Sequence, residues 1–238
     1  MTSSDQRRAP IAVALDSTNL EVAAGWAAAA ADWVSTMKIG LQFYLRHGAN
    51  GVARIRKAAP TCDVFLDLKL LDIPNTVRGA AEAVAPLAPD IVTVHALGGS
   101  AVVGAAVDAL PQTQIAAVTV LTSMTPADLA SVGLVGTPDD AVRRLAGLAA
   151  TAGARALVCS PREIAIVRAE VGTDLTLITP GVRPAGSANG DQARTATPEQ
   201  ALAAGADLLV VGRPITGAVD PGAAAKAIAE TLMSVSGG

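Results

Sequence analysis

The sequence predicts an α/β fold, a single (β/α)8 TIM barrel that spans residues 1–238. Eight short apolar runs, rich in branched side chains, alternate along the chain with segments of helical periodicity. Strands that alternate with helices pair in parallel through right-handed crossovers, and eight such units point to a closed barrel. A chain of 238 residues is long enough for one barrel, and a doubly wound open sheet is the lesser alternative.

The predicted strands are the eight apolar runs in chain order. They cover residues 11–15, 34–39, 62–66, 90–95, 115–121, 155–159, 175–179 and 208–212. Each run is short and is bounded by polar, glycine or proline residues, which is typical of a buried strand.

Several predicted helices carry recognisable start and stop signals. A capping side chain directly precedes a proline at Thr137, Ser160, Thr197 and Asp220. Glycines that are expected to end helices follow three of the helical segments, at positions 153, 172 and 205.

The first helix is predicted from a capping box. Thr18 and Glu21 have the required spacing, and the helix would run through Trp26 and Trp33. Both tryptophans are interpreted as packing residues, not as platforms for a ligand.

Composition excludes several functional classes. A net charge of −3 and a pI of about 5.4 leave no broad basic surface for nucleic acid or anionic lipid. The sequence has neither a signal peptide pattern nor an apolar run of about 18 residues, so we expect a cytoplasmic protein without a membrane segment. Cys62 and Cys159 lie in apolar runs without metal-ligand spacing and are expected to be free, buried thiols.

Charged residues crowd the end of the third predicted strand. Asp67 and Lys69 lie two residues apart, so a regular strand would send both side chains to one face. Asp72 follows in a turn that Pro74 forces, because proline cannot pair in a strand interior. A structural ion pair beside a helix cap is the alternative, but buried charge is rarely the most stable choice. A catalytic cluster is therefore favoured.

Polar residues gather where the other predicted strands end. The set comprises Asp16, Lys38, Asp67, Lys69, His95, Thr122, Ser123, Pro180 and Arg213. Any one of these side chains alone would be interpreted as a cap or a solvated loop residue. Together they form a ring, and the carboxyl ends of the strands are where a barrel of this kind places its active site.

Two long connections follow strands five and seven, at residues 122–136 and 181–195. The second is rich in glycine and poor in large apolar side chains, so it is predicted to be a lid, with a disordered connector as the alternative. Gly212 and Arg213 follow strand eight, the usual phosphate site of a barrel, and Arg183 could approach from the lid. A surface salt bridge is the alternative for Arg213.

The motif Asp67-x-Lys69-x-x-Asp72-Ile73-Pro74-Asn75-Thr76 resembles the signature of orotidine 5'-monophosphate decarboxylase. The resemblance extends along almost the whole chain. It includes Ala14-Leu15-Asp16, Lys38-Ile39-Gly40, His95-Ala96-Leu97-Gly98-Gly99, Val120-Leu121-Thr122-Ser123, Thr179-Pro180-Gly181-Val182-Arg183-Pro184, Asp191-Gln192-x-Arg194 and Val210-Val211-Gly212-Arg213.

The resemblance implies a barrel enzyme that decarboxylates orotidine 5'-monophosphate to uridine 5'-monophosphate without a metal or other cofactor. The implied catalytic residues are Lys38, Asp67, Lys69 and Asp72, with Lys69 as proton donor. The implied substrate contacts are Asp16 and Lys38 for ribose, Thr122 and Ser123 for the pyrimidine, Arg183, Gln192, Gly212 and Arg213 for phosphate, and also Asp67, Ile73, Thr76 and Pro180. It further implies a homodimer in which Asp72, Ile73 and Thr76 reach the neighbouring subunit's site.

Two other functions stay open at this point. A sugar-phosphate decarboxylase or aldolase of the same superfamily keeps a similar Asp-x-Lys-x-x-Asp but uses a magnesium-bound enediolate. Residues 73–76 and the Thr122-Ser123 pair favour the nucleotide enzyme. A non-catalytic phosphoribosyl-binding sensor is the other possibility, and the intact Lys69 argues against it.

Overall fold

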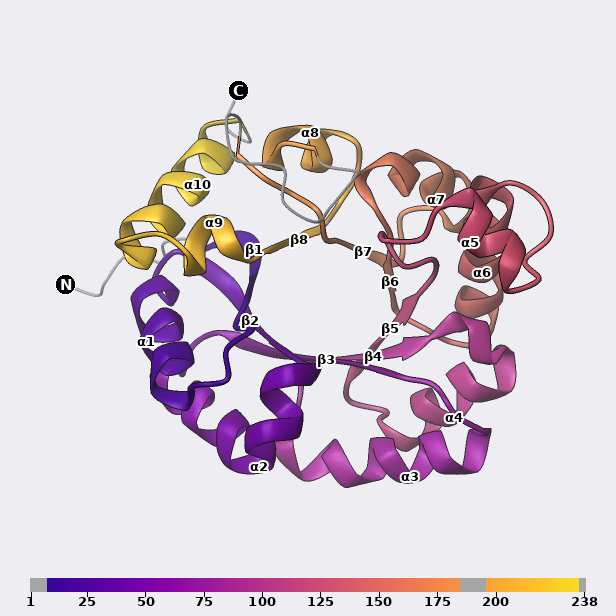
Figure 1. Cartoon of the computed structure of the whole chain (residues 1–238), viewed down its shortest axis with the longest axis horizontal. Helices are drawn as coiled ribbons and strands as arrows, with labels where there is room; N and C mark the ends of the chain where they lie inside the picture. The colour runs from indigo at the N-terminus through magenta and orange to yellow at the C-terminus, as the bar shows by residue number, and fades with distance from the viewer. Residues whose placement is uncertain (1–7, 185–195, 236–238) are drawn as a thin grey trace.

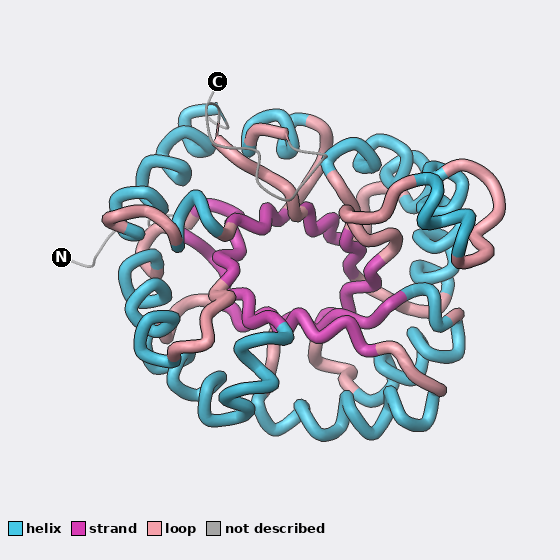
Figure 2. The backbone as a smooth tube through the Cα atoms, in the orientation of Figure 1, coloured by secondary structure: helices cyan, strands magenta, loops and turns pink. Residues whose placement is uncertain are grey.

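The chain folds into a closed barrel of eight parallel strands, in a computed structural model that describes residues 8–184 and 196–235. The strands follow one another around the barrel in sequence order, and β8 pairs with β1 to close it. Figure 1 looks along the barrel and shows the strands as a ring inside a ring of helices, and Figure 2 shows the same two layers by colour. The predicted (β/α)8 architecture is confirmed, and the open sheet is excluded.

The strands are β1 (Ala9–Ala14), β2 (Val34–Gly40), β3 (Asp63–Leu70), β4 (Ile91–His95), β5 (Gln114–Val118), β6 (Ala156–Val158), β7 (Thr176–Thr179) and β8 (Leu208–Val211). The α-helices are α1 (Leu20–Ala30), α2 (Leu41–Ala58), α3 (Pro74–Val84), α4 (Ser100–Ala109), α5 (Pro126–Ser131), α6 (Pro138–Thr151), α7 (Ile164–Val171), α8 (Pro198–Ala203), α9 (Arg213–Thr216) and α10 (Pro221–Val235). Short 3-10 helices are η1 (Ala85–Leu87), η2 (Ala96–Gly98) and η3 (Pro161–Glu163).

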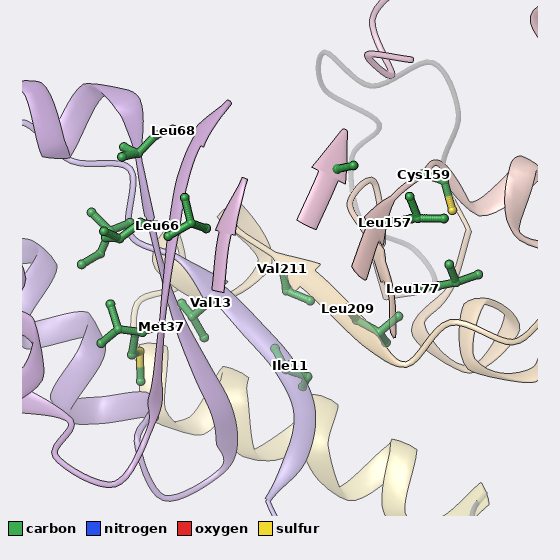
Figure 3. Packing of buried hydrophobic residues seen from close by; sticks show 14 of the residues in the cluster. Ile11, Val13, Met37, Leu66, Leu68, Leu157, Cys159, Leu177, Leu209 and Val211 are labelled. Carbon is green, nitrogen blue, oxygen red and sulfur yellow. The ribbon is translucent and has the colours of Figure 1, made fainter. Parts of the chain in front are cut away.

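The core has two parts because side chains alternate across each strand. The inner part fills the barrel and takes one side chain from most strands: Ala12, Phe65, Ile91, Ala116, Ala156, Ile178 and Leu208. The outer part lies between the strands and the helices, and Figure 3 labels members of it: Ile11, Val13, Met37, Leu66, Leu68, Leu157, Cys159, Leu177, Leu209 and Val211. Toward the carboxyl ends of the strands the inner face becomes more polar, above this packed interior.

Helix starts follow the predicted capping signals. Thr137 and Thr197 each cap a helix through reciprocal hydrogen bonds with the residue three positions later, Asp140 and Gln200. The Asp220 carboxylate accepts a hydrogen bond from the Ala223 backbone N–H at the start of α10. Ser160 precedes η3, where its backbone N–H donates to the Glu163 carboxylate. Glycines 153, 172 and 205 have positive φ angles at or just beyond helix ends, as predicted.

The predicted start of the first helix was wrong by one residue. Asn19, not Thr18, caps α1, and its side-chain oxygen accepts hydrogen bonds from the backbone N–H groups of Glu21 and Val22. The Glu21 carboxylate instead bonds to Arg54 on α2. The helix ends at Ala30, so Trp33 lies beyond it, and both tryptophans pack against the core as expected.

The connection after β5 also differs from its prediction. β5 ends at Val118, before the predicted end at residue 121, and the segment predicted as a long loop contains α5. Thr125 and Asp128 form a capping box that starts this helix. A six-residue helix shows too little periodicity to be detected, although its Thr-Pro start resembles the others.

Two further expectations can be checked against the fold. Both cysteines are free and buried, as predicted. Within residues 8–184 and 196–235, no helix has the length and apolar character needed to cross a membrane.

Candidate active site

A cavity of about 530 Å³ opens at the carboxyl ends of the strands. Its floor is apolar and is formed by inner-face residues, including Phe65, Val118, Val158, Ile178 and Val210. Nine of the residues singled out from the sequence line it: Asp16, Lys38, Asp67, Lys69, Thr122, Pro180, Arg183, Gly212 and Arg213. The strands thus bring side chains from across the sequence to one pocket.

A chain of alternating charges lies along one side of this cavity. The Asp67 carboxylate joins two lysines, with Oδ1 at 2.6 Å from Lys69 Nζ and Oδ2 at 3.2 Å from Lys38 Nζ. Lys38 Nζ also lies 3.7 Å from Asp16 Oδ1. The side chain of Lys38 is 7% exposed and that of Asp67 is 14% exposed, whereas Lys69 is 31% exposed and faces the cavity. Of the two lysines, Lys69 is therefore the one that substrate can reach more easily.

Gly40, at the end of β2, makes room for this arrangement. A Cβ atom at this position would lie 2.5 Å from Asp16 Oδ1 and 3.3 Å from Lys38 Nζ. Any larger residue would therefore displace the Asp16 carboxylate from Lys38.

The surroundings lower the pKa of two side chains at this end of the barrel, Asp67 and His95. Burial alone would raise the pKa of Asp67, but the charges of Lys38 and Lys69 and their hydrogen bonds outweigh it and lower the pKa below its ordinary value. Burial, with a smaller contribution from the charge of Lys69, lowers the pKa of His95. Asp67 is consequently ionised and His95 neutral at neutral pH.

The variant Asp67→Asn tests this assignment through its pH dependence. Because the folded-state pKa of Asp67 lies below the unfolded value of about 3.9, its ionised form adds stability above that pH. That contribution is lost as pH falls through the folded pKa. We expect D67N to be less stable than the parent by about 1.5–3 kcal/mol near pH 7, with the difference shrinking below pH 4. Urea denaturation at several pH values measures it.

Asp63, at the other end of β3, provides a control, because its pKa is shifted in the opposite direction from that of Asp67. Burial and the charge of Asp90 raise its pKa, so ionised Asp63 opposes folding. The variant Asp63→Asn should therefore lose no stability at neutral pH. A D67N deficit of equal size at pH 3 and pH 7 would contradict the assignment for Asp67.

The end of β3 is irregular, and this affects how Lys69 is presented. Leu66 pairs with Val92 on β4, and the next pair joins Leu70 to Val94, so β3 advances four residues while β4 advances two. Lys69 lies in this bulge with a φ of 49°, in the left-handed region. The two charges meet in the cavity as predicted, and Leu66, Leu68 and Leu70 pack on the outer side, although the pairing with β4 is interrupted by the bulge.

Sequence reasoning missed Thr93, on β4. Its hydroxyl donates to Asp67 Oδ1 at 3.1 Å and accepts from the Lys69 backbone N–H at 2.8 Å. The inner-face alternation of residues 91, 93 and 95 could have indicated it, because His95 was already placed at the strand end. His95 itself is buried, and its Nδ1 accepts from the Leu97 backbone N–H at 3.4 Å.

Besides His95, four predicted residues do not line the cavity of their own chain. Asp72 and Ile73 in the β3–α3 turn and Thr76 at the start of α3 are exposed, and Ile73 is 65% exposed. The Asp72 carboxylate accepts a hydrogen bond from the Ile73 backbone N–H. Ser123 follows Thr122 at the rim but is absent from the lining. Gln192 and most of the predicted lid, residues 185–195, lie outside the described residues.

Among the described residues, no group of three or more His, Cys, Asp or Glu side chains is arranged to hold a metal ion. The lysine and arginine side chains supply the positive charge of the cavity instead.

Comparison with known proteins decides the family. The model of the orotidine 5'-phosphate decarboxylase / HUMPS family matches residues 9–228, from the first residue of β1 into α10. The chain belongs to this family. The sequence resemblance to the decarboxylase is thereby confirmed, and the match includes every described lining residue of the cavity.

Relatives within the orotidine 5'-phosphate decarboxylase / HUMPS family match along nearly their whole length. The orotidine 5'-phosphate decarboxylase of Thermobifida fusca is 66% identical over 224 residues, which cover 94% of this chain and 96% of the relative. The protein of the same name from Frankia casuarinae is 55% identical, over 94% and 88% of the two chains. A crystal structure of orotidine 5'-phosphate decarboxylase from Lactobacillus acidophilus superposes with a TM-score of 0.82 at 34% identity, over 94% and 99%.

Proposed function

We propose that this protein decarboxylates orotidine 5'-monophosphate to uridine 5'-monophosphate and CO2, the last step of de novo pyrimidine nucleotide synthesis, without a metal or cofactor. The proposal rests above all on the Lys38–Asp67–Lys69 network at the cavity of a chain from this family. A single barrel domain over residues 1–238, acting in the cytoplasm, would carry the site.

The cavity has a suitable group for each part of this substrate. Arg183, Gly212 and Arg213 lie together on the β7 and β8 side, where Arg213 and Arg183 can offer planar donors to a phosphate. Asp16 and Lys38, on the β1 and β2 side, can bind ribose hydroxyls. The pyrimidine would then lie between Lys69 and Thr122, with Ser123, Pro180 and Gln192 completing the contacts.

The reaction breaks the bond between the pyrimidine ring and its carboxylate. The electron pair stays on the ring carbon and CO2 leaves, so the site must stabilise a carbanion that has no adjacent electron sink. The Lys69 ammonium lies at the cavity surface, where it can stabilise this charge and then transfer a proton to the carbon. Water returns the proton to Lys69 after product release.

Asp67 would act mainly by holding Lys69. Its Oδ1 lies 2.6 Å from Lys69 Nζ, which orients the ammonium before substrate arrives. Repulsion between Asp67 and the departing carboxylate is assigned a secondary part. Contacts to the distant phosphate would supply binding energy that closes the lid over the site.

The same proposal includes a homodimer with shared sites. Asp72 and Ile73 lie on the exposed β3–α3 turn, beside Leu71, which is 53% exposed, and Thr76 is exposed at the start of α3. Exposed apolar residues next to an exposed carboxylate suit a turn that inserts into the neighbouring subunit. Asp72 would then complete the alternation Lys38, Asp67, Lys69, Asp72 from across the interface.

An ultraviolet assay of orotidine 5'-monophosphate consumption, run with and without EDTA, tests the function. We expect turnover that the chelator leaves unchanged, because lysine ammonium groups replace the electron sink. A sugar-phosphate enzyme that relies on magnesium would show no nucleotide consumption, and EDTA would abolish its own reaction. A flat trace from well-folded protein would remove the proposed activity, and retained nucleotide binding would then favour the sensor.

A further inference from the structure

We propose that Thr93 is a positioning residue that sets the geometry of Lys69 and Asp67, an inference that rests on the proposed function. Thr93 is fully buried on β4 and does not line the cavity. One hydroxyl contacts both charged residues: it accepts from the Lys69 backbone N–H at 2.8 Å and donates to Asp67 Oδ1 at 3.1 Å. It thereby ties the main chain of the proton donor to the carboxylate that orients it.

The bulge in β3 explains why a side chain is needed here. Between the pairs Leu66–Val92 and Leu70–Val94, β3 has two more residues than β4 has over the same stretch. The Lys69 N–H falls in this interruption of the ladder, and a buried backbone donor must find another acceptor. The Thr93 hydroxyl is that acceptor.

The hydrogen bond from the Lys69 N–H to Thr93 matters because the backbone of Lys69 has an unfavourable conformation. A φ of 49° is unfavourable for a residue with a Cβ atom and persists only when surrounding contacts hold it. The bond to Thr93 is such a contact, and it fixes where the Lys69 side chain leaves the strand. Loss of the hydroxyl would let the backbone relax and would shift the ammonium relative to the cavity.

Thr93 also helps to fix which partner each carboxylate oxygen of Asp67 contacts. Oδ1 receives both the Thr93 hydroxyl and Lys69 Nζ, whereas Oδ2 faces Lys38. An ionised carboxylate can only accept, so the hydroxyl proton is donated to Asp67 Oδ1 while an oxygen lone pair accepts from the Lys69 N–H. The carboxylate is thus held against rotation from a position that substrate does not touch.

The test compares Thr93→Val, which keeps the branched shape but removes the hydroxyl, with Thr93→Ser, which keeps the hydroxyl. We expect T93V to lower kcat about 10- to 100-fold, as misplacement of a catalytic group by about 1 Å does, while KM changes less than about threefold. T93S should stay within about threefold of the parent. Thr36→Val is the matched control, because Thr36 is equally buried in β2 and bonds only to Ser35 among the described contacts.

A second readout needs no activity. In the ligand-free protein, hydrogen exchange of the Lys69 backbone amide should be faster in T93V and unchanged in T93S and T36V. If T93V does not fold, Thr93→Ala carries the same expectations, since it also lacks the hydroxyl.

Three results would overturn the positioning role. They are a T93V kcat within twofold of the parent, an equal loss in T93S, or a change confined to KM. If the parent itself consumes no orotidine 5'-monophosphate, the proposed function fails instead, and the Lys69 amide exchange still decides whether Thr93 holds the bulge.

Discussion

Replacement of Lys69 by alanine is expected to lower kcat by about 10⁴- to 10⁷-fold while nucleotide binding is retained. The range is the product of two effects that the ammonium would supply, proton transfer at about 10²–10⁴ and electrostatic stabilisation at about 10²–10³. Both arise from one atom, Lys69 Nζ, which is held by Asp67 at the cavity surface. In the proposed binding mode the phosphate and ribose groups contact other residues of the cavity, so affinity for the product nucleotide should change little.

Single-turnover kinetics and calorimetric titration with uridine 5'-monophosphate measure the two quantities separately. Lys57→Ala serves as the control, because Lys57 is exposed on α2, away from the cavity lining. A K69A variant that keeps kcat within tenfold of the parent would remove Lys69 from the chemistry. A non-catalytic sensor would instead show no turnover in either protein, and its nucleotide binding would be retained in K69A.

The barrel could be predicted from the sequence because its signals are local. A buried strand needs a short apolar run, and a helix start needs a capping side chain, so runs such as 208–211 and caps such as Thr197 are visible without a structure. The cavity followed from the same logic. Once eight strands are arranged in parallel, the residues after them, such as Lys38 and Arg213, must meet at one end.

Features that depend on pairing between strands could not be predicted. The bulge at Lys69 arises from the register of β3 on β4, and nothing in the alternation of residues 63–70 marks it. Alternation along β4 could place Thr93 on the inner face, but its hydrogen bonds arise only through that bulge and could not be predicted. Gly40 likewise matters because Asp16 approaches it from another strand end. The cap of α1 shows a smaller failure, since Asn19 and Thr18 are both good caps and local sequence does not separate them.

Mixing two inactive variants is expected to restore activity if the sites are shared between subunits. Asp72 is exposed on its own chain, and its carboxylate bonds locally to the Ile73 N–H, so in the proposed dimer it would act in the partner's site. A K69A homodimer lacks Lys69 in both sites, and an Asp72→Ala homodimer lacks Asp72 in both. In a mixed dimer, one site takes Lys69 from the D72A chain and Asp72 from the K69A chain, and is intact.

The size of the recovery follows from counting sites. With equal amounts of the two chains and free exchange in a twofold dimer, about half of the dimers are mixed and one of their two sites is intact, so about a quarter of parental activity should return. Co-expression of the chains with different tags, followed by the nucleotide assay, measures it. The matched control mixes K69A with Asp67→Ala: because Asp67 and Lys69 contact each other within one chain, no mixed dimer contains an intact site. If K69A and D72A also fail to complement although tag capture shows mixed dimers, Asp72 acts in its own chain's site or not at all, and the shared-site proposal is wrong.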